Sequence, residues 1–285
     1  MGEGILQYDF VLKSILGALF ASITAGIAGT YIVSRRMVFL SGGITHASFG
    51  GIGIGYFFGI SPILGAAVFG ILSALGVEYL SVKHKIREDS AIGILWAFGM
   101  ATGIIFIYLT PGYTPNLMSY LFGSLLTVTR ADIISLGVMS GILIVYFGMF
   151  YRTILYIAYD EMFARTFSSH VDVFKYVTTA LMALTIVLNI RMAGVVLVIS
   201  LLTIPPNIAM LLTKKYSKIV FVSILAGFIG TAGGYAISFS AGIPLGATII
   251  FTLVIIWVIV KGTIHLIKMT RKSIKENNNT STNIK

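Results

Sequence analysis

Nine apolar stretches divide the chain, and most of them approach the length of a membrane-spanning helix. Crossing the ~30 Å hydrocarbon core of a bilayer takes about 20 apolar residues in an α-helix. Two stretches are weaker, because the second is rich in glycine and only residues 191–193 separate the sixth from the seventh. We predict an all-α, polytopic membrane protein with about eight to nine transmembrane helices. The nine stretches are residues 10–33, 37–60, 62–82, 90–109, 132–150, 173–190, 194–212, 218–239 and 246–267.

The second stretch carries a stripe of small residues at every fourth position. Residues four apart lie on one face of a helix, and in lipid a small-residue face lets two backbones approach closely. The stripe therefore predicts close contact with a neighbouring helix. It consists of Gly43, Ala47, Gly51, Gly55 and Gly59.

A single histidine, His46, lies beside this stripe, ten residues after Arg36. At ~1.5 Å per residue it is roughly 15 Å from the basic pair, about half-way through a ~30 Å core. A polar side chain at that depth that is able to bind a metal is a candidate functional residue. A histidine that only donates a hydrogen bond to a neighbouring helix fits the position equally well.

Basic residues gather at one end of the predicted helices. The other end holds only Lys13, Arg130 and Arg191. Because basic residues favour the cytoplasmic side, we expect the N-terminus outside and the C-terminus in the cytoplasm. This asymmetry explains the net charge of +10, so we predict no nucleic-acid partner. The cytoplasmic end collects Arg35, Arg36, Lys83, Lys85, Arg87, Arg152, Arg165, Lys175, Lys214, Lys215, Lys218 and the cluster from Lys261 onward.

Composition supports the same class of protein. Hydrophobic residues make up 57% of the 285 residues and charged residues only 11%, with a mean hydropathy of +0.96. Because soluble domains are far less apolar, we expect a multi-pass protein of the cell (cytoplasmic) membrane. The chain has no cysteine, so it forms no disulfide and offers no thiolate metal site or thiol nucleophile.

Motifs of catalysis and nucleotide binding are missing from the sequence. It has no G-x-x-x-x-G-K-[ST], H-E-x-x-H or G-x-S-x-G pattern, which would indicate phosphate binding, zinc proteolysis or serine hydrolysis. Glu78 is the only acid in the interior of a predicted span, since Asp132 is the first residue of its stretch, and Glu78 lies near the span's end. There we expect an interfacial or paired carboxylate. We therefore predict no enzyme activity and no cofactor.

A tandem proline and a polar C-terminal segment each predict a local feature of the chain. The tandem prolines Pro205 and Pro206 remove backbone donors and predict a kink, which could serve packing or line a path. The polar residues 272–285 predict a disordered cytoplasmic tail, which leaves 1–271 as one transmembrane domain.

Five blocks of the sequence stand in an order that resembles one transporter family. The chain resembles the ABC-3 group, the membrane permease subunits of ABC importers for zinc, manganese and iron. The resemblance covers roughly residues 10–267. Its blocks are RRMVFLSGGITHAS at 35–48, EDSAIGILWAFGMATGI at 88–104, SYLFGSLLTVTRADI at 119–133, YDEMFART at 159–166 and AGVVLVISLLTIPPNIAMLL at 193–212.

The resemblance implies a permease for a divalent transition-metal ion, with zinc or manganese ahead of iron. It implies a homodimer, cytoplasmic ABC ATPase subunits and an extracytoplasmic metal-binding protein. His46 matches a gate residue of the translocation path. Ser41, Thr45 and Ser48 would line the path beside it. The block at 159–166 resembles the cytoplasmic coupling helix, through which the family's permeases contact the ATPase. The resemblance therefore implies that the residues in contact with the ATPase are Asp160, Glu161, Ala164 and Arg165.

Two positions depart from the family pattern. Many relatives carry an aspartate four residues before the histidine, where this chain has Gly42, and have Ala-Ala where it has Pro206-Asn207. A single imidazole gives a divalent cation fewer ligands than it usually takes. The hydroxyls, or a second His46 across a dimer, would therefore have to contribute. Two alternatives stay open. One is an importer of iron chelates or cobalamin, and the other is a stand-alone secondary metal transporter.

Overall fold

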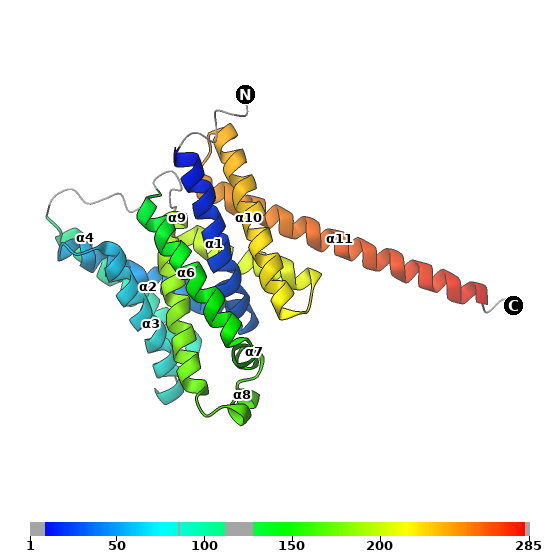
Figure 1. Cartoon of the computed structure of the whole chain (residues 1–285), viewed down its shortest axis with the longest axis horizontal. Helices are drawn as coiled ribbons and strands as arrows, with labels where there is room; N and C mark the ends of the chain where they lie inside the picture. Colours follow the sequence, from blue (N-terminus) through cyan, green and yellow to red (C-terminus); the bar gives the residue numbers. More distant parts are fainter. Residues whose placement is uncertain (1–8, 85, 112–127, 283–285) are drawn as a thin grey trace.

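The computed structural model describes residues 9–84, 86–111 and 128–282 (Figure 1). Within these ranges the chain forms ten helices and no strand, which confirms the prediction of an all-α fold. The segment 112–127, and with it much of the block at 119–133, lies outside the described residues. The helices are α1 (Asp9–Ser34), α2 (Val38–Phe57), α3 (Pro62–His84), α4 (Glu88–Leu109), α6 (Arg130–Met149), α7 (Tyr151–Tyr159), α8 (Glu161–Phe167), α9 (Val171–Leu212), α10 (Tyr216–Ala241) and α11 (Leu245–Thr282).

Seven of the described helices are long and apolar enough to cross a membrane, fewer than the eight to nine predicted. One reason is that α9 takes up the sixth and seventh apolar stretches as a single element of 42 residues. The other is α2, which is not among the seven because its glycines, hydroxyl residues and His46 lower its hydropathy. The orientation of the chain in the bilayer stays a prediction.

The two halves of α9 meet at Gly194. Its backbone angles, φ 76 and ψ 162, are the only non-helical pair inside the helix, and glycine is the residue that adopts them without strain. Pro205 and Pro206 lie further along α9, where both are buried and the backbone remains helical. The interruption of α9 thus falls at a residue that the sequence had not singled out. A bend at the tandem proline stays a prediction.

The small-residue stripe places α2 tightly between α3 and α4. A Cβ atom added at Gly99 of α4 would lie 2.5 Å from Cα of Ala47. One added at Gly50 would lie 2.8 Å from the carbonyl oxygen of Gly99, and one at Gly43 would lie 2.5 Å from Cγ2 of Ile92. The predicted close approach is therefore confirmed on two sides: Gly43 and Ala47 meet α4, whereas Gly51 and Gly55 meet α3.

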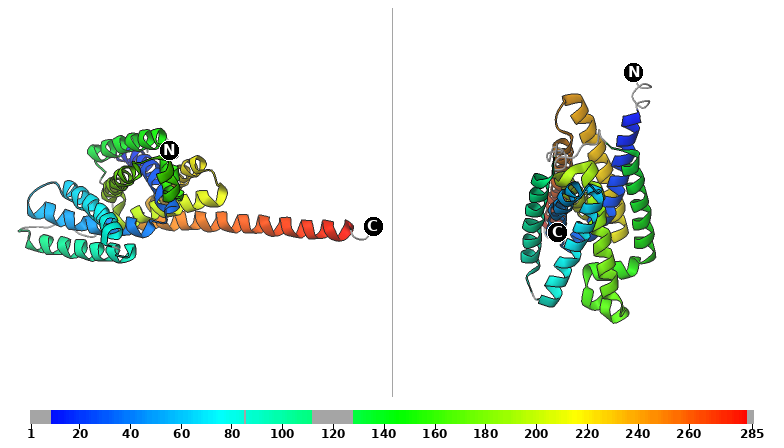
Figure 2. Two further views of the ribbon diagram at one scale, coloured as in Figure 1. Left: turned by 90° about the horizontal axis from the view of Figure 1, so that it is seen from below. Right: turned by 90° about the vertical axis from the view of Figure 1, so that its left-hand side faces the viewer.

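Helix α9 is the centre of the molecule and contacts α1, α2, α3, α10 and α11 along its length (Figures 1 and 2). Its side chains at Ile186, Leu197, Leu201 and Leu202 are at most 2% exposed. The short helices α7 and α8 lie at one end of the bundle (Figure 1). Helix α11 runs away from the bundle and continues to Thr282. The polar residues 272–282, for which the sequence predicts disorder, are therefore helical in the structure. The division into a transmembrane domain and a tail stays a prediction.

Candidate functional site

His46 lies on the side of α2 that faces α4. Its ring stacks on the indole of Trp96, with ring centroids 4.1 Å apart and planes 8° from parallel. The residue is half-buried, and its Nδ1 atom is covered without a hydrogen-bond partner in the described part of the chain. Stacking, rather than a bond from Nδ1 to a neighbouring helix, therefore holds this side chain.

Gly42 precedes His46 by one turn and lies on the same side of α2. A Cβ atom at Gly42 would lie 3.9 Å from Cδ1 of Ile199 and 4.0 Å from Cζ3 of Trp96. These are ordinary van der Waals distances, unlike those at Gly43 and Gly50. The position therefore has room for a Cβ atom, and close helix packing does not require glycine there.

The three hydroxyl residues of the predicted path lie on other sides of α2 and are buried. Ser41 donates to the Val38 carbonyl at 2.7 Å, and Thr45 donates to the Ser41 carbonyl at 2.5 Å. Ser48 likewise donates to the Ile44 carbonyl of its own helix at 2.7 Å. The structure thus brings Gly42 and Trp96 to His46 but does not bring these hydroxyls to it. Among the residues that the structure describes, no three His, Cys, Asp or Glu side chains gather at one place.

A network of charged side chains ties α8 to three long helices. Glu161 accepts from Arg165 at 2.9 Å within α8 and from Arg35, next to the α1–α2 turn, at 3.2 Å. It also pairs with Lys175 of α9 at 3.2 Å, and Lys175 in turn pairs with Glu78 of α3. Arg35, Lys175 and Glu78 are nearly buried, with side chains 13%, 12% and 9% exposed. The predicted pairing of Glu78 is confirmed.

Three cations surround Glu161 and determine its ionisation. Burial by itself would raise the pKa of the Glu161 carboxyl. The hydrogen bond from Arg165 and the charges of Lys175 and Arg35 outweigh burial, so the pKa lies below its usual range. Glu161 is therefore a carboxylate at neutral pH. Its contacts face the body of the protein, whereas the sequence analysis assigned it to an ATPase contact.

The other predicted coupling residues divide between the two sides of α8. Asp160 caps the helix, because its Oδ1 atom accepts from the Phe163 amide at 3.0 Å. Arg165 is half-exposed and pairs with Asp172 at 2.6 Å. Ala164 is only 2% exposed and belongs to a small core with Ile157. It is therefore an internal packing residue of this end of the protein.

Exposed apolar side chains cover the outward side of α8. Met162 is 77% exposed, Phe167 67% and Phe163 45%. The sequence-based assignment did not include these three side chains, because it chose Asp160, Glu161, Ala164 and Arg165 from the same block. The alternation of Met162, Phe163 and Phe167 with inward-facing Glu161 and Ala164 is the helical pattern that would have indicated them.

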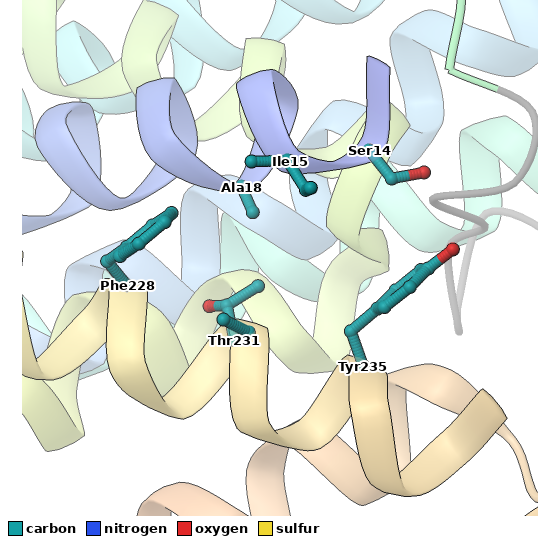
Figure 3. A pocket seen from close by; sticks show the side chains of 7 residues that line it. Ser14, Ile15, Ala18, Phe228, Thr231 and Tyr235 are labelled. Atoms are coloured by element: carbon teal, nitrogen blue, oxygen red, sulfur yellow. The ribbon is translucent and has the colours of Figure 1, made fainter. Parts of the chain in front are cut away.

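A cavity of about 230 Å³ lies between α1 and α10 (Figure 3). Ser14 and Ala18 face Phe228, Thr231 and Tyr235 across it. Its lining is mostly apolar and includes no charged side chain. The lining therefore does not suit a metal cation, and His46 remains the candidate.

Fold and site together define a class, namely a multi-pass, all-helical membrane protein with long helices around α9 and short helices at one end. The chain belongs to the ABC 3 transport family, whose model matches residues 7–262. The protein is accordingly a membrane transport protein of the cell membrane.

Three relatives illustrate the family. The chain is 31% identical to the manganese transport system membrane protein MntC of Listeria monocytogenes, covering 90% of this chain and 91% of the relative. It is 38% identical to a membrane protein of Synechocystis sp. whose function is uncharacterized, covering 89% of this chain and 90% of that one. The solved structure of PsaBC from Streptococcus pneumoniae in complex with Fab matches with a TM-score of 0.81 and 26% identity, covering 90% of this chain and 93% of that one.

Proposed function

We propose that this protein is the membrane-spanning permease subunit of an ABC importer that moves a divalent transition-metal ion into the cytoplasm. The observation that carries the proposal is the near full-length similarity to MntC, a protein named for manganese transport. Among the metals that the resemblance implied, we therefore rank manganese as the first candidate for the transported ion and zinc as the second. The subunit itself hydrolyses no nucleotide, because a partner ATPase supplies that energy.

His46 is the proposed metal ligand of the translocation path. It is half-buried and stacked on Trp96, and its covered Nδ1 atom has no hydrogen-bond partner among the described residues. A neutral imidazole nitrogen is a good ligand for divalent transition metals. A second copy of the chain in a homodimer supplies a second imidazole, so that two His46 side chains share one ion between the protomers.

Helix α8 is the proposed contact with the ATPase. Met162, Phe163 and Phe167 offer an exposed apolar surface, which fits a groove on a partner protein. The ion pairs of Glu161 with Arg35 and Lys175 join α8 to the α1–α2 turn and to α9. Movement of α8 on ATP binding is thereby transmitted to the turn between α1 and α2, and so to the helix that carries His46.

The experiment is metal uptake by proteoliposomes that hold this chain with its ATPase, fed by its extracytoplasmic binding protein. We expect ATP-dependent uptake of manganese that His46→Gln strongly reduces, because glutamine retains a polar side chain but binds metal poorly. Gly42→Asp adds a carboxylate one turn before His46, at a position where a Cβ atom has ordinary contacts, so it should tighten metal binding and slow release.

Each contrary result overturns a different part of the proposal. Uptake without the ATPase would indicate a secondary transporter. Uptake of an iron chelate or cobalamin in place of the free ion would indicate the other importer class. If His46→Gln transports like the unmodified protein, the metal path does not use His46.

A further inference from the structure

The last helix is too long to lie wholly within a membrane. α11 has 38 residues, about 57 Å at ~1.5 Å per residue, against a hydrocarbon core of ~30 Å. Its first half packs on α9 and α10, where Ile249 and Leu253 are fully buried. Its later part extends away from the bundle (Figure 1), and there Ile259 and Leu266 are at least 60% exposed.

A basic stripe begins where α11 leaves the bundle. Lys261, His265 and Lys268 are spaced four and three residues apart, so they share one face of the helix. Lys272 and Lys275 continue the same spacing in the sequence, and no acidic residue occurs between positions 245 and 275. Within the described residues, no ion pair involves the three side chains of the stripe. The charges of Lys261 and Lys268 are therefore available to a partner.

These three residues line a groove between α11 and the end of α9. The groove has a volume of about 510 Å³, and Leu211, Trp257 and Val258 form its apolar wall. The ammonium nitrogen of Lys261 lies 4.7 Å from the centroid of the Trp257 ring. A groove with a basic rim, an apolar wall and a tryptophan matches the boundary between lipid headgroups and acyl chains.

We propose that this groove binds an anionic phospholipid. The phosphate lies between Lys261 and Lys268, and an acyl chain lies along Leu211 and Val258. Charge complementarity favours a lipid because the apolar half of α11 fixes the groove at the membrane surface, where anionic headgroups are concentrated. The inference requires only a membrane protein and is independent of the proposed metal transport.

The two tryptophans of the chain, Trp96 and Trp257, allow a direct test. In full-length protein with Trp96→Phe, only Trp257 fluoresces, and lipids brominated on the acyl chain quench it on contact. We expect brominated phosphatidylglycerol to quench Trp257 at lower mole fractions than brominated phosphatidylcholine. Lys261→Gln with Lys268→Gln should weaken this preference roughly thirtyfold, the magnitude typical of two lysines at an anionic surface.

Two control variants separate the groove from charge in general. Lys214→Gln with Lys215→Gln removes the same charge at the α9–α10 turn and should retain the preference. Lys261→Arg with Lys268→Arg keeps the charge and should also retain it. Equal quenching by both lipids in the parent protein, or equal loss in both glutamine variants, would overturn the proposal. Displacement of the lipid by an acidic peptide or an oligonucleotide at equal charge concentration would indicate a macromolecular partner and would also overturn it.

Discussion

Position 42 and position 99 are both glycine, but for different physical reasons. At Gly42 an added Cβ has ordinary contacts, whereas at Gly99 it would meet the Ala47 backbone at 2.5 Å. We expect Gly42→Ala to change the free energy of unfolding by no more than about 1 kcal/mol, in the stabilising direction that alanine favours in helices. Gly99→Ala should cost about 1–3 kcal/mol through overpacking. Thermal unfolding in detergent measures both, and equal midpoints for the two variants would contradict this packing.

Glu161 stabilises the protein through its charge, and the effect depends on pH. Its pKa is lowered in the folded state, so its stabilisation is complete above the unfolded-state pKa of about 4.3 and is lost as the pH falls through the folded-state value. We expect Glu161→Gln to lower the unfolding midpoint equally at pH 7 and pH 5. Below about pH 4 the difference from the unmodified protein should shrink.

An exposed ion pair provides the control for Glu161. Asp89 pairs with Arg87 at 2.9 Å, but both side chains are more than 60% exposed. Surface pairs of this kind contribute about 0–1 kcal/mol, so Asp89→Asn should leave the midpoint nearly unchanged. A loss for Asp89→Asn as large as that for Glu161→Gln would mean that charge in general, and not the network around α8, stabilises the protein.

At the scale of the element, α8 is a short helix with an inner charged side and an outer apolar side. Met162→Ser with Phe167→Ser removes the outer surface without touching the Glu161 network. We expect much weaker capture of the ATPase in pull-downs, with unchanged abundance of the permease. Two side chains of the same types and similar exposure serve as the control: Met149 is 72% exposed and Phe221 67%. Equal capture by both double variants would remove α8 from the docking surface.

The whole molecule has two ends whose sides of the membrane are predicted from charge. Ser169, after α8, and Ser240, at the end of α10, are both exposed and lie at opposite ends of the bundle (Figure 1). Since the chain has no cysteine, a single cysteine at either position is a unique label. An impermeant maleimide should label Ser240→Cys in intact cells and Ser169→Cys only after permeabilisation. The reverse pattern would invert the predicted orientation.

Some properties of this protein follow from the sequence alone. Long apolar stretches predict the helices because hydropathy is a local property that each segment carries by itself. The stripe around Gly43 and Gly51 predicts the close packing of α2 because helical spacing fixes which residues share a face. The composition excludes an ordinary soluble domain without reference to any contact.

Other properties depend on residues far apart in the chain, and only the tertiary structure decides them. Glu161 faces inward because Arg35, from the α1–α2 turn, and Lys175, from α9, meet it there. Ala164 is buried as a consequence, and Met162 is left exposed. The stacking of His46 on Trp96 likewise joins side chains of two different helices, α2 and α4. A short helix carries too few residues to determine its own orientation, so the charges and side chains that surround it determine which side is buried.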